Sequence, residues 1–452
     1  MKVLLIQPAE VAYKSYNIIT NLTNFSYRFI RSKTPPIGIA YLASTIEKAG
    51  HTVKIIDSTV MNYRLRHIKR EIKRFNPDVV GVTAMTTFIY DALEVLKLVK
   101  KLNPNCLTVL GGPHPTVQTK EILNEVDFVD VIVRGEGEKT LLELIEKSNF
   151  EKIDGISYKE NNKIIENKNR ELIKDLDSIP FPAYHLLPMH KYQIKLADIG
   201  VLGGLDLLGH PYGAIVTSRG CPFNCNFCAA RAIWGNNWRG RSPENIVEEL
   251  KLLREEYGIR KISFMDDLFT VDKKRVIKTC ELIKKEDLDI SWFCLSRVDS
   301  FNKEIAESLK SAGCFRVWFG IESGTQETLN LLNKTFKLED SKKAVKITKD
   351  AGLDAAGFFM IGIPGETKEM MEKTIAFANK LHLSTSIINL FIPYPGTKFY
   401  EIADQQNLIL SKDWSKYHTN KSLMKIPGFT AHQLEKMWKK AHLSFNLSNL
   451  KS

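Results

Sequence analysis

Short apolar runs alternate with amphipathic stretches along the first 147 residues. The stretches at 36–50 and 90–101 have the spacing of polar and apolar positions that helices show. Continuous apolar strands separated by helices are typical of a parallel sheet that is covered on both faces. The pattern therefore predicts a doubly wound α/β domain over residues 1–147, with its ligand at the carboxyl ends of the strands. The predicted strands are residues 3–6, 53–57, 78–83, 107–112 and 129–133.

The same alternation returns after residue 213. Helical stretches such as 243–256 and 341–351 separate the apolar runs of this second region. Repeated strand–helix units close into a barrel, so we expect a partial (βα)6 barrel over residues 206–405 with its chemistry at the carboxyl-terminal mouth. Its predicted strands are residues 214–217, 262–267, 290–295, 316–320, 356–362 and 386–390.

Residues 148–205 follow neither pattern. The part from 158 to 169 is mostly polar and has a turn signal at Asn161-Asn162. The run Ile179-Pro180-Phe181-Pro182 favours stiff extended chain, because proline fixes its own φ and restricts the residue before it. We therefore predict a linker that straps the two domains together.

Residues 406–452 predict a small helical C-terminal segment. Apolar side chains recur at helical spacing between 432 and 447, whereas the lysines of this stretch fall on another side. One interpretation is a lid that packs on the barrel. The alternative is a helix that contacts a membrane surface and serves a lipid substrate. The apolar positions are Leu434, Trp438, Ala441 and Phe445.

Composition limits the class of protein. The chain has 452 residues, 44% of them hydrophobic and 26% charged, which is typical of a soluble globular protein with two or three domains. No apolar run approaches the length of a membrane span, and Met1–Pro8 predicts a first strand rather than a signal peptide. We therefore expect a cytoplasmic location, where thiols stay reduced. The net charge of +12 comes from dispersed lysines, so no nucleic-acid partner is expected.

Three of the seven cysteines lie close together, in the spacing Cys-x-x-x-Cys-x-x-Cys. A disulfide does not fit an odd number of thiols at this spacing, and a structural zinc site usually has two separated pairs of ligands. Three thiolates suit three irons of a cubane cluster, which leaves the fourth iron open to a substrate. The predicted iron ligands are Cys221, Cys225 and Cys228. We expect buried structural thiols at Cys106, Cys280, Cys294 and Cys314.

The cysteine segment resembles the signature of the radical S-adenosylmethionine (SAM) enzymes. Three further segments are similar to motifs of that family and occur in its order: Gly320-Ile321-Glu322-Ser323-Gly324, Gly362-Ile363-Pro364-Gly365-Glu366-Thr367 and Pro393-Tyr394-Pro395-Gly396-Thr397. The resemblance covers residues 214 to 400. It implies a 4Fe-4S cluster, SAM as a bound partner, and an external electron donor such as flavodoxin or ferredoxin.

The resemblance also implies roles for single residues around SAM. Asp266 stands where the family binds the methionine amine, with Asp267 as an alternative that either replaces it or caps the next helix. Arg297 is expected to pair with the methionine carboxylate, with a surface ion pair as the alternative. The other positions implied to contact ribose, amine or adenine are Phe227, Gly320, Glu322, Ser323, Gly362, Ile363 and Pro364.

The first domain resembles the Rossmann-like cobalamin-binding domain that precedes the barrel in many radical SAM enzymes. Pro35-Pro36-Ile37-Gly38 and Gly111-Gly112-Pro113-His114 carry this resemblance. No G-x-G-x-x-G follows the first strand, so a dinucleotide is not expected. The Asp-x-His-x-x-Gly motif of cobalamin mutases is absent, and we expect His114 to pack within its loop. The residues expected at the cobalamin edge are Thr83, Thr86, Gly111, Gly112, Gly135 and Glu136.

Together the resemblances imply a cobalamin-dependent radical SAM enzyme. The expected reaction methylates an unactivated carbon through a 5′-deoxyadenosyl radical and methylcobalamin. Alternatives are a cyclisation, ring contraction or isomerisation, and a first domain that serves only as a scaffold without cobalamin. A non-enzymatic electron carrier is a third class, but it would not require the Glu322-Ser323 and Gly362–Gly365 segments. The substrate stays open among peptide, lipid, tetrapyrrole and natural-product precursors.

Overall fold

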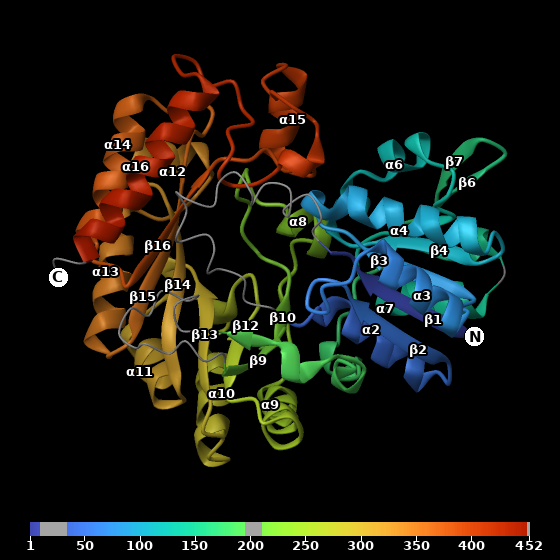
Figure 1. Ribbon diagram of the computed structural model, residues 1–452. Coiled ribbons are helices and arrows are strands. Elements are labelled where there is room, and N and C mark those ends of the chain that lie inside the picture. Colours follow the sequence, from blue (N-terminus) through green and yellow to red (C-terminus); the bar gives the residue numbers. More distant parts are fainter. Residues whose placement is uncertain (10–33, 148, 195–209, 450–452) are drawn as a thin grey trace. The chain divides into compact units, whose positions relative to one another are not determined.

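A computed structural model describes residues 1–9, 34–147, 149–194 and 210–449 (Figure 1). The chain forms two compact units, each treated by itself below. Unit 1 comprises Met1–Tyr192, Ala232–Gly235 and Asp413–Ser415, and unit 2 comprises Gln193–Arg231, Asn236–Lys412 and Lys416–Ser452.

Unit 1 is built on a seven-stranded sheet of order β2-β1-β3-β4-β5-β6-β7. The first five strands are parallel, which confirms the predicted doubly wound domain. Their bounds are Lys2–Gln7 (β1), Thr52–Asp57 (β2), Val79–Thr83 (β3), Leu107–Gly111 (β4) and Val131–Val133 (β5). The helices are Ile37–Lys48 (α2), Leu65–Phe75 (α3), Ile89–Leu102 (α4), Pro113–Val117 (α5), Thr119–Glu125 (α6) and Glu138–Glu146 (α7).

Alternation along the strands divides the core of unit 1 into two layers. Leu4, Ile6 and Val82 lie in one apolar cluster with side chains of α3 and α4. Their neighbours in sequence point to the other face, because successive side chains of a strand alternate. On that face α2 packs beside α7. This arrangement leaves the carboxyl ends of β3 and β4 as an edge formed by loops.

The predicted linker is structured over much of its length. β6 (Ile156–Glu160) and β7 (Lys163–Glu166) form an antiparallel hairpin that extends the sheet of unit 1 beyond β5. The turn signal at Asn161-Asn162 is confirmed, since both residues have positive φ, as the favoured two-residue hairpin turn requires. The domain boundary at 147 stays a prediction. The boundary near 205 lies outside the described residues.

Unit 2 contains the predicted partial barrel. Six strands are parallel in the order β16-β15-β14-β13-β12-β9, and the short β8 (Gln193–Ile194) joins β9 antiparallel. The six strands are His210–Ile215 (β9), Lys261–Phe264 (β12), Ser291–Ser296 (β13), Cys314–Glu322 (β14), Asp354–Ile361 (β15) and Thr385–Leu390 (β16). The helices of unit 2 are Pro243–Tyr257 (α9), Lys273–Lys285 (α10), Lys303–Ser311 (α11), Gln326–Leu331 (α12), Leu338–Asp350 (α13), Lys368–Lys380 (α14), Lys398–Gln405 (α15) and Ala431–Asn449 (α16). The short helix Ala230–Trp234 (α8) has its residues divided between the two units.

The C-terminal helix α16 packs against β16. Trp438 is buried, and its indole Nε1 donates a 2.7 Å hydrogen bond to the main-chain oxygen of Ile388. The four predicted apolar positions of this helix are all buried, so its apolar face is used for packing within unit 2. None of the helices over the described residues has the length and apolarity needed to cross a membrane.

Candidate cluster and cofactor sites

The loop with the three cysteines begins at a turn that only glycine fits. β10 (Ser218–Arg219) pairs with β11 (Arg239–Gly240), and Gly220 follows with φ of +89°. A Cβ atom on Gly220 would collide with the main-chain oxygen of Asn237. Glycine has no Cβ and accepts this backbone conformation without strain, so the path of the chain into Cys221 depends on Gly220.

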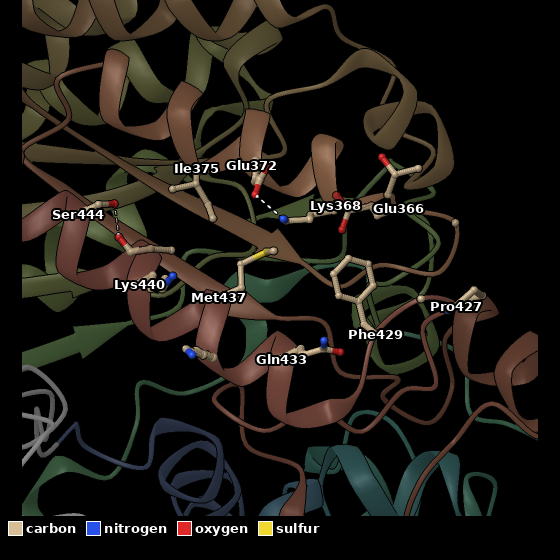
Figure 2. Close-up of a pocket in the computed structure, with 15 residues that line it drawn as sticks. Glu366, Lys368, Glu372, Ile375, Pro427, Phe429, Gln433, Met437, Lys440 and Ser444 are labelled. Carbon is tan, nitrogen blue, oxygen red and sulfur yellow. Dashed lines mark hydrogen bonds and ion pairs between the residues drawn. The ribbon is translucent and has the colours of Figure 1, made fainter.

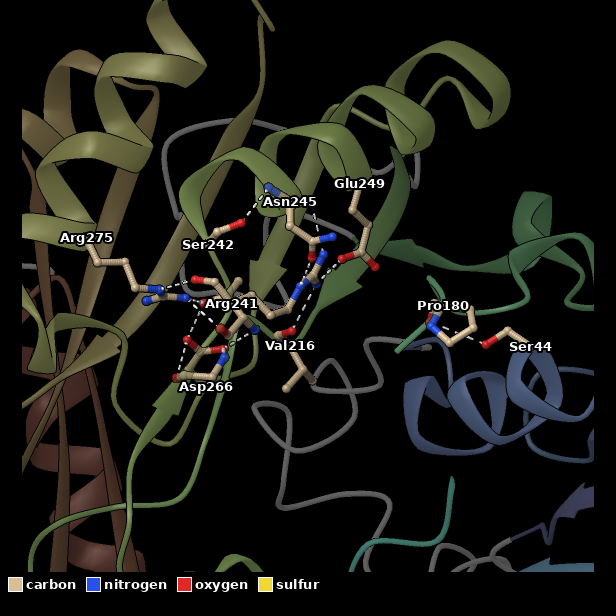
Figure 3. A network of polar contacts seen from close by, with 11 residues as sticks. Ser44, Pro180, Val216, Arg241, Ser242, Asn245, Glu249, Asp266 and Arg275 are labelled. Carbon is tan, nitrogen blue, oxygen red and sulfur yellow. Dashed lines mark hydrogen bonds and ion pairs between the residues drawn. The ribbon is translucent and has the colours of Figure 1, made fainter. Parts of the chain in front are cut away.

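Asp266 anchors the residues that precede this turn (Figure 3). Its buried carboxylate accepts hydrogen bonds from the main-chain nitrogens of Thr217 and Ser218, at 2.6 and 3.1 Å, and from both hydroxyls. A buried carboxylate with four donors has its main hydrogen-bonding capacity satisfied within the protein. The structure therefore gives Asp266 an anchoring role, and its predicted contact with the methionine amine stays a prediction.

Two buried arginines complete this anchor (Figure 3). Arg275 Nη2 donates to the main-chain oxygen of Thr217 at 2.6 Å, and its Nε donates to the oxygen of Arg241 at 2.8 Å. Arg241 Nη1 donates to Val216 and pairs with the buried Glu249 of α9. Since charge-assisted hydrogen bonds in a buried network resist rearrangement, the start of the cysteine loop is rigidly held.

A second clamp holds the middle of the loop. Asn226 donates through its main-chain nitrogen to the oxygen of Leu332 at 3.1 Å, and through its amide to that of Leu331 at 2.9 Å. Asn333 donates in return to the main-chain oxygen of Asn224 at 2.6 Å. The segment at the end of α12 therefore holds the cysteine loop in place through these hydrogen bonds.

Arg297 is buried and forms an ion pair with Asp299, which is exposed. Its guanidinium binds both carboxylate oxygens of Asp299, at 2.8 and 2.9 Å, and donates to Thr335 at 3.1 Å. It also lies over the ring of Phe223, 3.5 Å from the ring centroid. The ion pair of the alternative is therefore present, but only Asp299 is exposed, and the Arg297 side chain itself is buried. Arg297 supports the cysteine loop through Phe223, and its pairing with the methionine carboxylate stays a prediction.

Glu322 ends β14 in an unusual conformation. The pairing of β14 with β15 is irregular between Gly320 and Glu322, and Glu322 has φ of +68°. Its carboxylate lies 3.1 Å from Nζ of Lys334, which is also buried and lies 5.6 Å from the ring centroid of Phe227. A non-glycine residue in the left-handed region is uncommon, and at a glutamate it makes the position a candidate for function. This geometry supports the predicted role of Glu322 and adds Lys334 to the site.

We expect Glu322→Gln to reduce both stability and SAM affinity. Removing one partner of a buried ion pair leaves Lys334 uncompensated, which costs about 3 kcal/mol of unfolding free energy. Loss of a charge-assisted hydrogen bond is expected to weaken SAM binding by about 1.5–3 kcal/mol. Chemical unfolding and equilibrium binding of SAM measure the two effects. The double variant Glu322→Gln with Lys334→Met is the control, since it should regain stability without regaining affinity. Unchanged SAM affinity in the single variant would remove Glu322 from the site.

Ser323 and the loop that begins at Gly362 are each fixed by a hydrogen bond to another residue of unit 2. The Ser323 hydroxyl is buried and lies 3.0 Å from that of Thr374, so it supports the loop after β14. Gly362 has φ of +78° and begins the loop that continues through Ile363 and Pro364. The buried carboxylate of Glu366 accepts from the nitrogen of Ile363 at 2.9 Å and fixes that loop.

Glu366 gives the barrel a pH dependence of known sign. Burial raises the pKa of Glu366 from 4.5 to about 7. The folded state therefore holds the proton more tightly than the unfolded state, and stability falls as the pH rises from about 4.5 to 7. We expect Glu366→Gln to be more stable than the parent at pH 8 by about 3 kcal/mol and equal to it near pH 4. Urea unfolding at several pH values measures this difference, and the same pH slope in both proteins would contradict it.

The carboxyl edge of the sheet in unit 1 collects the residues predicted for cobalamin. Thr83 and Gly111 are register partners at the ends of β3 and β4. Gly112 has φ of +102°, and a Cβ atom on it would lie 2.9 Å from the main chain of Ala84. The close approach of these two loops therefore requires glycine at 112 for the fold itself. A Cβ on Gly111 would make only ordinary contacts, at 3.6 Å or more.

The other residues predicted for this edge, Gly135 and Glu136, both make hydrogen bonds within unit 1. The buried carboxylate of Glu136 accepts from the main-chain nitrogen of Ile173 at 2.7 Å, so it holds the linker segment. Gly135 has φ of +68°, and its nitrogen donates to Thr116 at 3.1 Å. Met85, between Thr83 and Thr86, is exposed. Sequence reasoning missed this apolar side chain at the edge.

His114 packs within its loop, as predicted. It is buried, its Nδ1 lies 3.2 Å from the hydroxyl of Thr86, and its ring meets Trp414 at a centroid distance of 4.9 Å. Burial lowers the pKa of His114 to about 4, so the ring is neutral at physiological pH. This histidine and Thr86 therefore form one packed group behind the edge.

Comparison with known proteins agrees with this geometry. The model of the B12 binding domain matches residues 29–145, and that of the radical SAM superfamily matches residues 215–378. The chain is 43% identical to an uncharacterised methyltransferase of Pyrococcus horikoshii, over 99% of this chain and 93% of that protein. The chain belongs to the radical SAM superfamily. Within it, this radical SAM chain carries an N-terminal B12-binding domain.

More distant relatives of the radical SAM chain have several activities. It is 30% identical to an anaerobic magnesium-protoporphyrin IX monomethyl ester cyclase of Rubrivivax gelatinosus, over 88% of this chain and 71% of that protein. The solved structure of the radical SAM methyltransferase TsrM from Kitasatospora setae, with cobalamin and a [4Fe-4S] cluster bound, superposes with a TM-score of 0.71 at 18% identity, over 91% of this chain and 79% of that chain. At this identity the likeness shows the fold.

The donor set of the radical SAM chain suits an iron–sulfur cluster. Burial raises the pKa of Cys221, and it raises that of Cys228 to about 12, with the Asp267 carboxylate adding to both shifts. Cys228 is nonetheless an exposed residue. Such thiols lose their protons when they bind a cation such as iron. Over the described residues, no three Cys, His, Asp or Glu side chains gather to hold a single metal ion.

Asp267 is the carboxylate that faces outward beside this loop. It is exposed where its neighbour Asp266 is buried. Loss of hydration, followed by repulsion from Asp266, raises the pKa of Asp267 to about 6. Of the two predicted candidates for the methionine amine, Asp267 is therefore the one that a ligand can reach.

Sequence reasoning missed the segment Leu331–Phe336 altogether. This segment holds the cysteine loop through Asn333 and brings Lys334 to Glu322 and Phe227. The available signal was a lysine with an apolar residue two positions away on either side, Leu332 and Phe336, shortly after the Glu322 motif. A charged residue in an apolar context is expected to be paired when it is buried.

Proposed function

We propose that this radical SAM chain is a cobalamin-dependent methyltransferase that methylates an unactivated carbon. The observation that carries the proposal is the 43% identity, over nearly the whole chain, to a protein named as an uncharacterised methyltransferase. Two relatives with methyl-transfer names support it further: the hopanoid C-3 methylase of Methylococcus capsulatus, at 26% identity, and the cytidylyl-2-hydroxyethylphosphonate methyltransferase of Streptomyces wedmorensis, also at 26%.

In this proposal the cluster would provide the reducing electron for SAM, and cobalamin would provide the methyl group. The residues of the chain position these groups. Cys221, Cys225 and Cys228 would hold the cluster, and the anchor at Asp266 keeps their loop in place. Glu322, compensated by Lys334, presents a carboxylate for the ribose or amine of SAM.

The residues of unit 1 would hold the corrinoid at the carboxyl edge of the sheet. Gly111 lacks a side chain there, and the exposed Met85 offers apolar surface to a flat ring. His114 is not proposed as a ligand of the corrinoid, because it is buried against Trp414. The predicted contacts of Thr83, Thr86 and Gly135 with the corrinoid belong to this proposal.

The experiment that tests the proposal separates the two cofactors. The parent, Gly111→Leu and Cys221→Ala are reconstituted anaerobically with iron, sulfide and cobalamin, and corrinoid content and 5′-deoxyadenosine formation are measured. Gly111→Leu is expected to lose corrinoid and keep SAM cleavage, whereas Cys221→Ala is expected to do the reverse. Gly111 is chosen over Gly112 because the fold tolerates a Cβ there. A parent that binds no corrinoid would overturn the methyltransferase proposal.

A cyclase is the second candidate, because cyclases that act on magnesium-protoporphyrin IX monomethyl ester are 30% identical to this chain. The reconstituted protein is incubated with a host cell extract and with SAM that carries a deuterated methyl group. This experiment distinguishes a methyltransferase from a cyclase. A methyltransferase yields a product that retains the label, whereas a cyclase yields an unlabelled product. Either reaction requires an external electron donor, such as flavodoxin or ferredoxin, and a cytoplasmic location agrees with a site built on reduced thiols.

A further inference from the structure

Unit 2 has a hollow that lies apart from the cysteine loop. It is bounded by α14, α16 and the turn at residues 427–429, and its volume is about 920 Å³ (Figure 2). This size falls within the range of small-molecule sites. Its inner wall includes Gly365 and Glu366, which follow the predicted SAM loop directly. None of the roles assigned so far to the cofactors uses the rest of this hollow.

The floor of the hollow is apolar. Ile375 of α14 and Met437 of α16 point toward one another across it, and Phe429 closes one end (Figure 2). All three side chains are only half-buried. Because methionine adapts its shape to different partners, this floor suits an apolar chain or ring that would cover it.

The rim of the hollow carries three lysines, Lys368, Lys436 and Lys440, and the carboxylate of Glu372. Lys436 and Lys440 are exposed and stand four residues apart on α16, so their charges are neighbours on the helix surface. Like charges at this spacing destabilise a helix. Lys368 on the opposite wall is paired with Glu372 at 3.7 Å, but within the described ranges no carboxylate lies within ion-pair distance of Lys436 or Lys440. An anionic group between them would relieve this repulsion.

We propose that this hollow binds a small amphiphile with an apolar body and a phosphate or carboxylate head. The head lies between Lys436 and Lys440, and the body covers Met437, Ile375 and Phe429. A bilayer surface fits less well, because the apolar face of α16 is buried against β16 and the apolar atoms here are recessed between two helices. The occupant is therefore a dissolved molecule, or a lipid taken from its membrane.

Calorimetric titration of the reconstituted protein with decyl phosphate tests the proposal. We expect decyl phosphate to bind about ten-fold more tightly than decanol, because only the former has a charge for the two lysines. Lys436→Ala with Lys440→Ala should lose this advantage. Lys439→Ala is the matched control, since Lys439 is exposed on the same helix but does not line the hollow, and it should bind as the parent does.

Two further arms separate the alternatives. Met437→Ser should weaken decyl phosphate binding and leave any binding of inorganic phosphate unchanged, which shows that the apolar floor takes part. Binding by the parent to vesicles with anionic lipid, in the absence of binding to monomeric decyl phosphate, would assign the lysines to a membrane surface and overturn the proposal. Equal affinity in the double lysine variant and in Lys439→Ala would overturn it as well. None of these measurements depends on SAM cleavage or corrinoid, so they stand apart from the proposed methyl transfer.

Discussion

Replacing Cys221, Cys225 or Cys228 by alanine is expected to abolish cluster content and SAM cleavage together. Each sulfur would hold one iron, and the remaining thiols of the chain are buried elsewhere. No neighbouring cysteine can therefore take the place of a lost ligand. Iron and sulfide analysis, the visible absorbance of the cluster and the yield of 5′-deoxyadenosine measure the loss. A single variant with full iron content and full cleavage would contradict the assignment.

The other cysteines provide the control for this result. Cys106, Cys280, Cys294 and Cys314 are all buried, so their alanine variants should lose only packing. We expect a cost of about 1–2 kcal/mol in unfolding free energy for each of them. Cluster content should remain that of the parent, which separates a general loss of stability from the loss of a ligand.

Replacing Gly220 by alanine is expected to disrupt the cysteine loop without removing any ligand. The added Cβ collides with the main-chain oxygen of Asn237, and neither partner is a flexible side chain that can move aside. The backbone must therefore shift just before Cys221. We expect a loss of about 2–4 kcal/mol in stability and a large decrease in cluster content, measured on the same reconstituted sample.

Gly258 is a matched control for Gly220. It also has a positive φ, of +65°, but a Cβ atom on it would meet nothing within 4 Å. Gly258→Ala should therefore lose only about 1 kcal/mol of unfolding free energy, because of the backbone conformation. It should keep its cluster. Equal behaviour of the two variants would show that φ alone, and not the collision with Asn237, decides the outcome.

The fold was predictable where a strand is buried on both faces. Runs such as residues 79–83 and 107–111 are continuous and apolar because helices cover both sides of the sheet. The hairpin β6–β7 was missed because β7 (Lys163–Glu166) is a short edge strand whose charged ends are exposed. The surrounding segment is mostly polar, so it resembles a loop. The sequence indicated only the turn at Asn161-Asn162.

The site was predictable in its ligands but not in its supports. The spacing of the three cysteines is a local pattern, so the sequence alone points to the cluster. Whether Asp266 or Asp267 faces the protein depends on donors from Thr217 and Ser218, about 48 residues earlier in the chain. The pairing of Lys334 with Glu322 likewise depends on a turn whose path no local pattern reveals.

The two clamps on the cysteine loop have a consequence for how the enzyme matures. Protein donors fix the loop before Cys221, through Asp266, and between the cysteines, through Asn226 and Asn333. The shape of the loop is therefore set by the barrel, and folding does not have to wait for iron. We therefore expect the cluster to be inserted after the chain has folded, into a loop where Cys228 is an exposed residue.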